Sequence, residues 1–153
     1  MLRLGLPVAA AIAVLDQLSK WCVLELVMQP PRTIPVTSFF NLVLAWNRGI
    51  SFSLLASAPE ASRWLFVALS AAITGGLLVW LARVRTNLLA LAIGLIVGGA
   101  IGNAVDRVNH GAVVDFIELH AMEFYWPAFN MADSAITVGV VLILWDTLFV
   151  RRR

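Results

Sequence analysis

Long apolar stretches separated by short polar segments dominate this chain of 153 residues. Four stretches are long enough to cross a bilayer as helices, which takes roughly 17–25 residues each. They cover residues 4–27, 64–82, 88–105 and 132–150. The first has features of a cleavable signal peptide, but Asp16 and Lys20 interrupt it and apolar residues continue beyond them. We therefore expect a retained helix, and we predict an all-α integral membrane protein with one membrane domain over residues 1–153.

Composition supports this class and excludes several others. The chain is 61% hydrophobic and 13% charged, whereas a soluble domain is about half apolar and about a quarter charged. Cys22 is the single cysteine, and no disulfide framework or zinc-ligand spacing exists. The chain also has no phosphate-binding glycine loop, no nucleophilic serine motif and no nucleic-acid signature. We therefore expect no cofactor, no metal and no nucleic-acid partner.

Basic residues predict the direction of the spans. With four spans, one side receives Arg3, Arg83, Arg85 and the three arginines of residues 151–153. Short basic segments mark the cytoplasmic side, so both termini should be cytoplasmic. The opposite side then receives the two long connections, residues 28–63 and 106–131.

The two connections contain strand-like runs. Residues 39–46 and 111–117 are short and apolar, and Asn47-Arg48-Gly49 is typical of a turn. A small sheet at the membrane surface would accommodate both runs. In the third span, Gly94, Gly98 and Gly102 recur every four residues, which predicts a helix face for close packing against another helix.

Polar residues cluster where the third span meets the second connection. Asn103, Asp106 and Arg107 share one helix face, because they are spaced at i, i+3 and i+4. In one interpretation, Asp106 or Asp115 simply neutralises Arg107. In the other, the Arg107 guanidinium binds a substrate carbonyl or a lipid oxygen.

A second polar segment opens the fourth span. Asn130 followed by Asp133 has the spacing of a helix cap with a capping acid. A helix N-terminus also stabilises a carboxylate charge, so Asp133 could be both a cap and a base. Asp115 has only apolar sequence neighbours. If the two acids lie close together, repulsion should leave one of them protonated, which is the arrangement of an acid–base pair.

Asp16 and Lys20 lie at i and i+4 inside the first span. They either form a self-neutralising pair within the helix or support the polar site. His110 and His120 have no metal-ligand spacing, and we interpret both as surface residues.

Three function classes remain open from the residues alone. A pair of carboxylates sharing a water suggests a peptidase. A small transporter or proton channel would use Asp16, Lys20 and the boundary acids as a relay, and a membrane scaffold would use the same groups only as helix caps. The acids cluster at one face rather than at several depths, which favours the peptidase.

Five segments in order along the chain resemble bacterial lipoprotein signal peptidase, also called signal peptidase II. The matching segments are residues 16–20, Asn47-Arg48-Gly49 with Phe52, Gly98 to Asn103 with Asp106-Arg107, Val114-Asp115-Phe116, and Phe129-Asn130 with Ala132-Asp133-Ser134. Ile50-Ser51 departs from the family pattern of two small residues after the glycine. Met131 replaces a more usual small or branched apolar residue.

This resemblance implies an aspartic endopeptidase of the bacterial inner membrane with its active site at the periplasmic face. It would remove signal peptides from diacylglyceryl-modified prolipoproteins amid membrane phospholipid, acting as a monomer. Antibiotics such as globomycin would occupy its site. The implied fold has four membrane helices, a small periplasmic β-cradle and a periplasmic helix or loop. By position, the implied catalytic residues are Asp115 and Asp133. The implied site-lining residues are Asp16, Asn47, Gly49, Asn103, Asp106, Arg107 and Asn130, and we add Lys20 because it belongs to the same matching segment as Asp16.

Overall fold

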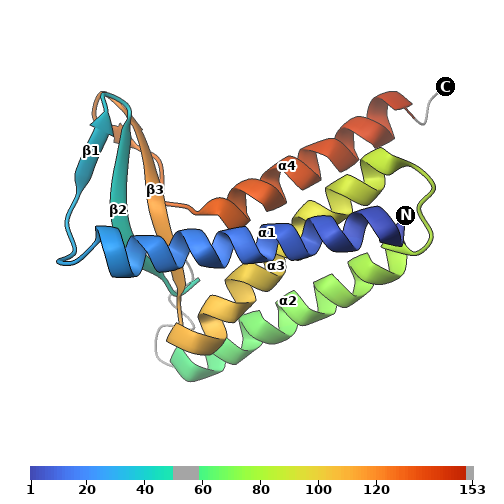
Figure 1. Cartoon of the computed structure of the whole chain (residues 1–153), viewed down its shortest axis with the longest axis horizontal. Coiled ribbons are helices and arrows are strands. Elements are labelled where there is room, and N and C mark those ends of the chain that lie inside the picture. Colours follow the sequence, from blue (N-terminus) through green and yellow to red (C-terminus); the bar gives the residue numbers. More distant parts are fainter. Residues whose placement is uncertain (50–58, 151–153) are drawn as a thin grey trace.

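The computed structural model describes residues 1–49 and 59–150, and these form four long helices and a four-stranded sheet (Figure 1). Each long helix has the length and hydropathy to cross a membrane, which confirms the prediction of four spans. The helices are α1 (Leu2–Cys22), α2 (Pro59–Leu81), α3 (Asn87–His110) and α4 (Met131–Trp145). Short π-helical segments extend α1 and α4, namely η1 (Val23–Val27) and η3 (Asp146–Val150).

Two helices are longer than the apolar pattern indicated. α2 begins at Pro59 rather than near residue 64, and α3 continues past residue 105 to His110. Hydropathy underestimates α3 because its last turns carry polar side chains that are buried in the protein. Gly111 ends this helix in the left-handed conformation, with φ 72°, which glycine adopts without strain. Asp106 and Arg107 therefore lie on this helix, as their predicted shared face with Asn103 requires.

α3 is the central helix of the bundle. It packs against α1, α2 and α4, and it is the most buried of the four, whereas α2 is the most exposed. The predicted glycine face is in contact with α1: a Cβ at Gly98 would lie 2.6 Å from the Ala9 carbonyl oxygen. Gly94 also meets the α1 backbone, at the Gly5 carbonyl oxygen, whereas Gly102 meets the Asp16 side chain of α1 and Gly99 meets the backbone of α4. The close-packing prediction for this glycine face is confirmed.

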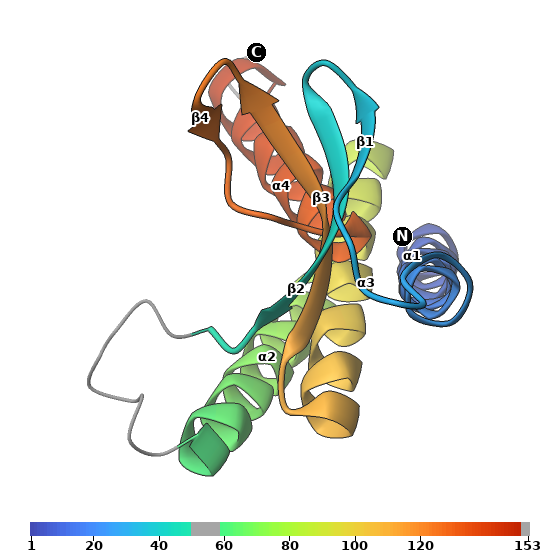
Figure 2. The same cartoon turned by 90° about the vertical axis from the view of Figure 1, so that its left-hand side faces the viewer.

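The sheet lies at one end of the bundle, and α1 begins at the opposite end (Figures 1 and 2). Its antiparallel strands follow the order β1 (Ile34–Thr37), β2 (Phe40–Asn47), β3 (Val113–Ala121) and β4 (Phe124–Tyr125). Both predicted strands are therefore present, and β3 extends beyond its predicted end. The described parts of the two connections, residues 28–49 and 111–130, contain no helix. Ile50, Ser51 and Phe52 lie outside the described residues, as does the basic tail at residues 151–153.

Strand pairing joins the two connections at the end of the bundle. β2 and β3 pair with Ala45 opposite Asp115 and Asn47 opposite Val113. Phe129 then bridges to Ile117 of β3 immediately before α4 begins. This bridge fixes the start of α4 beside the strand that carries Asp115.

Candidate active site

Asp115 lies on β3 with its carboxylate buried, at 1% exposure. Oδ1 accepts a hydrogen bond from Asn130 Nδ2 at 2.6 Å, and Oδ2 accepts one from Asn47 Nδ2 at 2.9 Å. Burial raises the pKa of Asp115 from 3.8 to about 6; the Asn47 hydrogen bond opposes this rise, and the charge of Asp133 adds to it. Asp115 is therefore disposed to hold a proton up to about pH 6.

Asp133 is the third residue of α4 and forms the predicted capping box with Asn130. The Asp133 backbone N–H donates to Asn130 Oδ1 at 2.9 Å, and the Asn130 backbone N–H donates to Asp133 Oδ2 at 3.2 Å. Asn103 Nδ2 donates to the other carboxylate oxygen, Oδ1, at 2.8 Å. Both oxygens of Asp133 are thus acceptors at a helix N-terminus, where the dipole stabilises negative charge.

Asn130 connects the two acids. Asn130 is fully buried. Its Nδ2 donates to the Asp115 carboxylate, and its Oδ1 accepts a hydrogen bond from the Asp133 backbone N–H. Since an amide has distinct donor and acceptor ends, these two partners fix the orientation of the Asn130 side-chain amide. The structure therefore brings both sequence-predicted catalytic residues to one side chain.

Asp133 is the more accessible of the two acids. It is partly exposed and lines a groove of about 500 Å³ between the sheet and α4. The other lining residues are largely apolar, and they are Leu119, Trp126, Phe129, Ser134, Thr137 and Val138. A peptide could therefore reach Asp133 from the outside, while Asp115 is held behind it.

A buried ionic cluster lies behind the site. The Lys20 ammonium donates to Asp16 Oδ2 at 2.7 Å and to Asn103 Oδ1 at 3.1 Å, and it forms an ion pair with Asp106 Oδ2 at 2.8 Å. The intrahelical Asp16–Lys20 pair expected from the sequence is present, but Lys20 also supports the site through Asn103. Asp106 pairs with Lys20 and not with Arg107.

The cluster also fixes the start of α4. Asp16 Oδ1 accepts from the Ala132 backbone N–H at 2.9 Å, which satisfies one of the N–H groups that a helix N-terminus leaves unpaired. A Cβ at Gly102 would overlap Asp16 Oδ2, so only glycine leaves room for this carboxylate. Asp106 Oδ2 accepts from the Val114 backbone N–H at 3.0 Å. α1, α3, β3 and α4 are therefore joined at one point.

Arg107 and Gly49 lie at the edge of the site. Arg107 Nη1 donates to the Asn103 carbonyl oxygen at 3.3 Å, and its guanidinium lies 5.2 Å from the centre of the Phe66 ring. Gly49 turns the chain with φ 73°, and its backbone N–H donates to Asn47 Oδ1 at 2.8 Å. Neither residue contacts an acid of the pair directly, but each contacts an asparagine that does.

Sequence reasoning missed Gln17. Its Nε2 donates to Asp106 Oδ1 at 2.8 Å and to the Gly102 carbonyl oxygen at 3.2 Å. The available signal was an amide inside an apolar span, beside Asp16, where each polar group needs a partner. His110 is exposed and packs edge-on against Trp46, while the partly buried His120 stacks on Tyr125. Within residues 1–49 and 59–150, no group of three or more His, Cys, Asp or Glu side chains is arranged to hold a metal ion.

Comparison with known proteins identifies the family. The family model described as signal peptidase (SPase) II matches residues 8–149. A lipoprotein signal peptidase of Azoarcus sp. (strain BH72) is 54% identical over 94% of this chain and 81% of its own length. That of Methylobacterium sp. (strain 4-46) is 46% identical over 99% of this chain and 93% of its own length.

Solved structures agree with this assignment. A bacterial membrane enzyme solved by the in meso method superposes with a TM-score of 0.83 at 28% identity, covering 95% of this chain and 92% of that one. A second superposes with a TM-score of 0.78 at 29% identity, covering 94% and 89%. These likenesses extend over the four spans and the sheet alike, so this multi-pass membrane protein belongs to the signal peptidase II family of peptidases.

Proposed function

We propose that this protein is an aspartic endopeptidase that removes the signal peptide from diacylglyceryl-modified prolipoproteins, cutting before the lipidated cysteine. The observation that carries the proposal is the pairing of Asp115 and Asp133 through Asn130. The two carboxyls have contrasting surroundings: one is buried and disposed to hold a proton, and the other is a partly exposed acceptor at a helix N-terminus. Such contrast is how two identical groups divide acid and base roles.

Asp133 acts as the base in this mechanism. It takes one proton from a water molecule, and the water oxygen forms a bond to the scissile carbonyl carbon. Asp115 then gives its proton to the leaving nitrogen as the C–N bond breaks. The products are a signal peptide with a new carboxyl terminus and a lipidated cysteine with a free amine. One proton remains on the pair, now on Asp133, and its return to Asp115 completes the cycle.

The surrounding amides serve this chemistry by position. Asn103, held by Lys20, keeps its N–H group on Asp133. Asn47 and Asn130 hold Asp115, and Arg107 has donors free to bind a substrate carbonyl. The residues that perform each step are all supplied by the protein, so the mechanism needs no metal or cofactor. A peptide antibiotic such as globomycin would compete for the groove beside Asp133.

Location follows from the charges at the two ends of the bundle. Arg3, Arg83 and Arg85 belong to the end away from the sheet, and the acid pair lies at the sheet end. We therefore place both termini in the cytoplasm and the site at the periplasmic face of the bacterial inner membrane.

In a Cys22→Ala background, an impermeant thiol reagent should label Glu123→Cys but not Arg85→Cys in intact spheroplasts. The reverse pattern would overturn this orientation.

The decisive experiment removes each carboxylate in turn. Purified Asp115→Asn and Asp133→Asn proteins should each cleave a diacylglyceryl prolipoprotein about 10²–10⁴-fold more slowly than the parent, the range for loss of a general acid or base. Glu118→Gln is the matched control because it removes a carboxylate from the same strand. It should retain parental activity.

Two results would contradict the proposal. Near-parental cleavage by either asparagine variant would exclude the acid pair as the catalyst. Loss of parental activity upon addition of a chelator would exclude the metal-free mechanism.

A further inference from the structure

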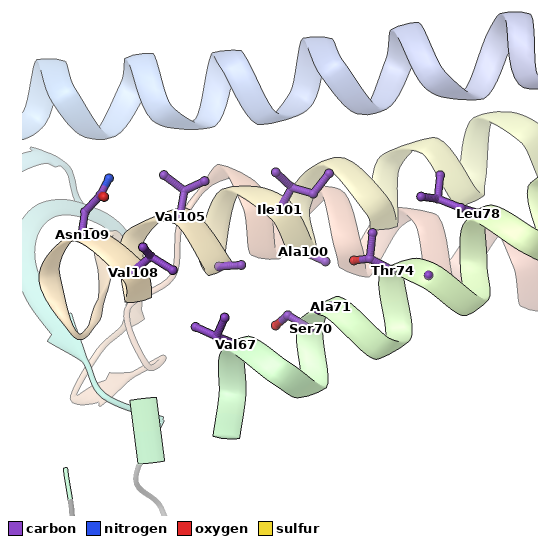
Figure 3. A pocket seen from close by; sticks show the side chains of 12 residues that line it. Val67, Ser70, Ala71, Thr74, Leu78, Ala100, Ile101, Val105, Val108 and Asn109 are labelled. Carbon is purple, nitrogen blue, oxygen red and sulfur yellow. The ribbon is translucent and has the colours of Figure 1, made fainter. Parts of the chain in front are cut away.

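A second groove lies between α2 and α3, on the side of α3 that faces away from the acid pair. It has a volume of about 530 Å³. Figure 3 shows the side chains of α2 and α3 that line it. Its lining consists of Val67, Ser70, Ala71, Thr74, Gly75, Leu78, Ala100, Ile101, Ala104, Val105, Val108 and Asn109. α2 packs mainly against α3 and is the most exposed of the four helices, so this groove opens towards the membrane.

Small side chains keep the groove open. Ala71 and Gly75 line it from α2, and Ala100 and Ala104 line it from α3. A Cβ at Gly75 would meet no atom within 4 Å, so this glycine does not bring two helices together. The lining is mostly apolar and includes no titratable side chain. The groove therefore suits a hydrocarbon and offers no site for a charged group.

The groove is connected to the acid pair through two side chains. Phe66 precedes Val67 of the lining, and its ring lies against Gly49, two residues after Asn47. The Arg107 guanidinium lies over the same Phe66 ring, 5.2 Å from the ring centre. Arg107 interacts electrostatically with Asp133 and Asp115. Its buried Nε has no hydrogen-bond partner among the described residues.

The size of the groove decides which apolar part of the substrate fits. The substrate of the proposed reaction has two: a signal helix and the acyl chains of its lipid. A helix about 10 Å across fills on the order of 850 Å³ in only two turns, which exceeds the groove. A single acyl chain is much thinner. We propose that the α2–α3 groove binds one acyl chain of the substrate's diacylglyceryl group.

This inference rests on the proposed function, and its test separates the two. Two substrates of identical peptide sequence carry either long or short acyl chains. Ala71→Phe fills the groove, and Ala72→Phe is the matched control because Ala72 is an exposed neighbour on α2 outside the lining. We expect Ala71→Phe to lower kcat/KM for the long-chain substrate roughly tenfold or more, the equivalent of losing contact with about two methylene groups. The short-chain substrate should be cleaved within about twofold of the parental rate, and Ala72→Phe should change neither.

Each other outcome overturns the assignment. An equal loss on both substrates would assign the groove to the signal helix or to the fold. Parental cleavage of both substrates by Ala71→Phe would assign it to bulk lipid. Failure of the parent protein to cleave either substrate would instead contradict the proposed function.

A measurement without turnover tests the same assignment. A substrate with a photoreactive group at the end of its long acyl chain should cross-link Asp115→Asn protein within residues 67–78 or 100–109. Cross-links confined to the groove beside Asp133 would place the chain there and overturn the proposal.

Discussion

Towards α1 and α4, the small residues of α3 bring backbones into contact, whereas towards α2 they border an open groove. A Cβ at Gly98 would lie 2.6 Å from a backbone oxygen of α1, but a Cβ at Gly75 on the groove side of α2 would touch nothing within 4 Å. The packed side also carries the ionic cluster and the amides that hold the acid pair, whereas no titratable side chain lines the groove on the open side. Rigid support for catalysis and space for an apolar ligand are thus assigned to opposite sides of one helix.

This difference suggests how the site stays fixed while a lipid enters. The acids are held by hydrogen bonds from Asn47 of β2, Asn103 of α3 and Asn130 at the start of α4, and Asp16 of α1 supports that start. α2 takes part in none of the hydrogen bonds described for the pair and its asparagines. Movement of α2 could therefore admit a substrate without disturbing the geometry of Asp115 and Asp133. Three predictions test this division, beginning with the largest effect.

Lys20→Met should destabilise the packed side most. The substitution leaves the Asp16 and Asp106 carboxylates buried without their shared cation, and breaking a buried pair in this way costs about 3–5 kcal/mol. Equilibrium unfolding in mixed micelles measures the change. Arg85→Met removes an exposed cation at the other end and should stay within about 0.5 kcal/mol of the parent. Parental stability of Lys20→Met would mean that the cluster does not hold this side together.

The stability of the packed side should depend on pH through the ionisation of Asp115. Because its pKa is raised from 3.8 to about 6, the folded chain keeps a proton that the unfolded chain releases between these values. The contribution of this group to stability is therefore largest in acid and declines as pH rises through the window, by about 3 kcal/mol in total. The same ionisation should lower kcat/KM above about pH 6, since Asp115 must supply a proton.

Asp115→Asn provides the control for that pH dependence. Its unfolding free energy should lack the decline between about pH 4 and about pH 6. If parent and variant show the same pH dependence of stability, Asp115 does not titrate as its burial requires. Ala71→Phe, on the open side, should follow the parental pH profile because no titratable residue lines the groove.

The sequence predicted elements better than it predicted partners. Hydropathy located all four spans, and the Asn130–Asp133 spacing correctly predicted the capping box. It missed the end of α3, because hydropathy treats Asp106 as a boundary residue although Lys20 neutralises it inside the protein. Sequence spacing also could not show that Asp106 pairs with Lys20 rather than with adjacent Arg107, since that choice depends on how α1 lies against α3.

Glycine patterns show the same limit more sharply. The four-residue repeat at Gly94, Gly98 and Gly102 predicted a contact face, and that face is present. Gly75 and Gly76 in α2 are equally small, yet a Cβ at either would meet nothing within 4 Å. A single sequence gives the size of a side chain but not whether a neighbour approaches it. The groove therefore became apparent only from the structure.

The smallest effects should come from one substitution made on both sides of the comparison. Gly98→Ala inserts a methyl group against the Ala9 carbonyl oxygen and Ile12, which forces α1 and α3 apart and should cost about 1–3 kcal/mol. Gly75→Ala inserts the same group into open space, so only the helix preference for alanine remains, a gain of at most about 1 kcal/mol. Unfolding of the two variants in the same micelles measures both. Because the chemical change is identical and both sites are helical, intrinsic preference cancels from the difference between them. Equal stability of the two variants would mean that the packed side of α3 relaxes as freely as the open one, and the contrast between the two sides would then fail.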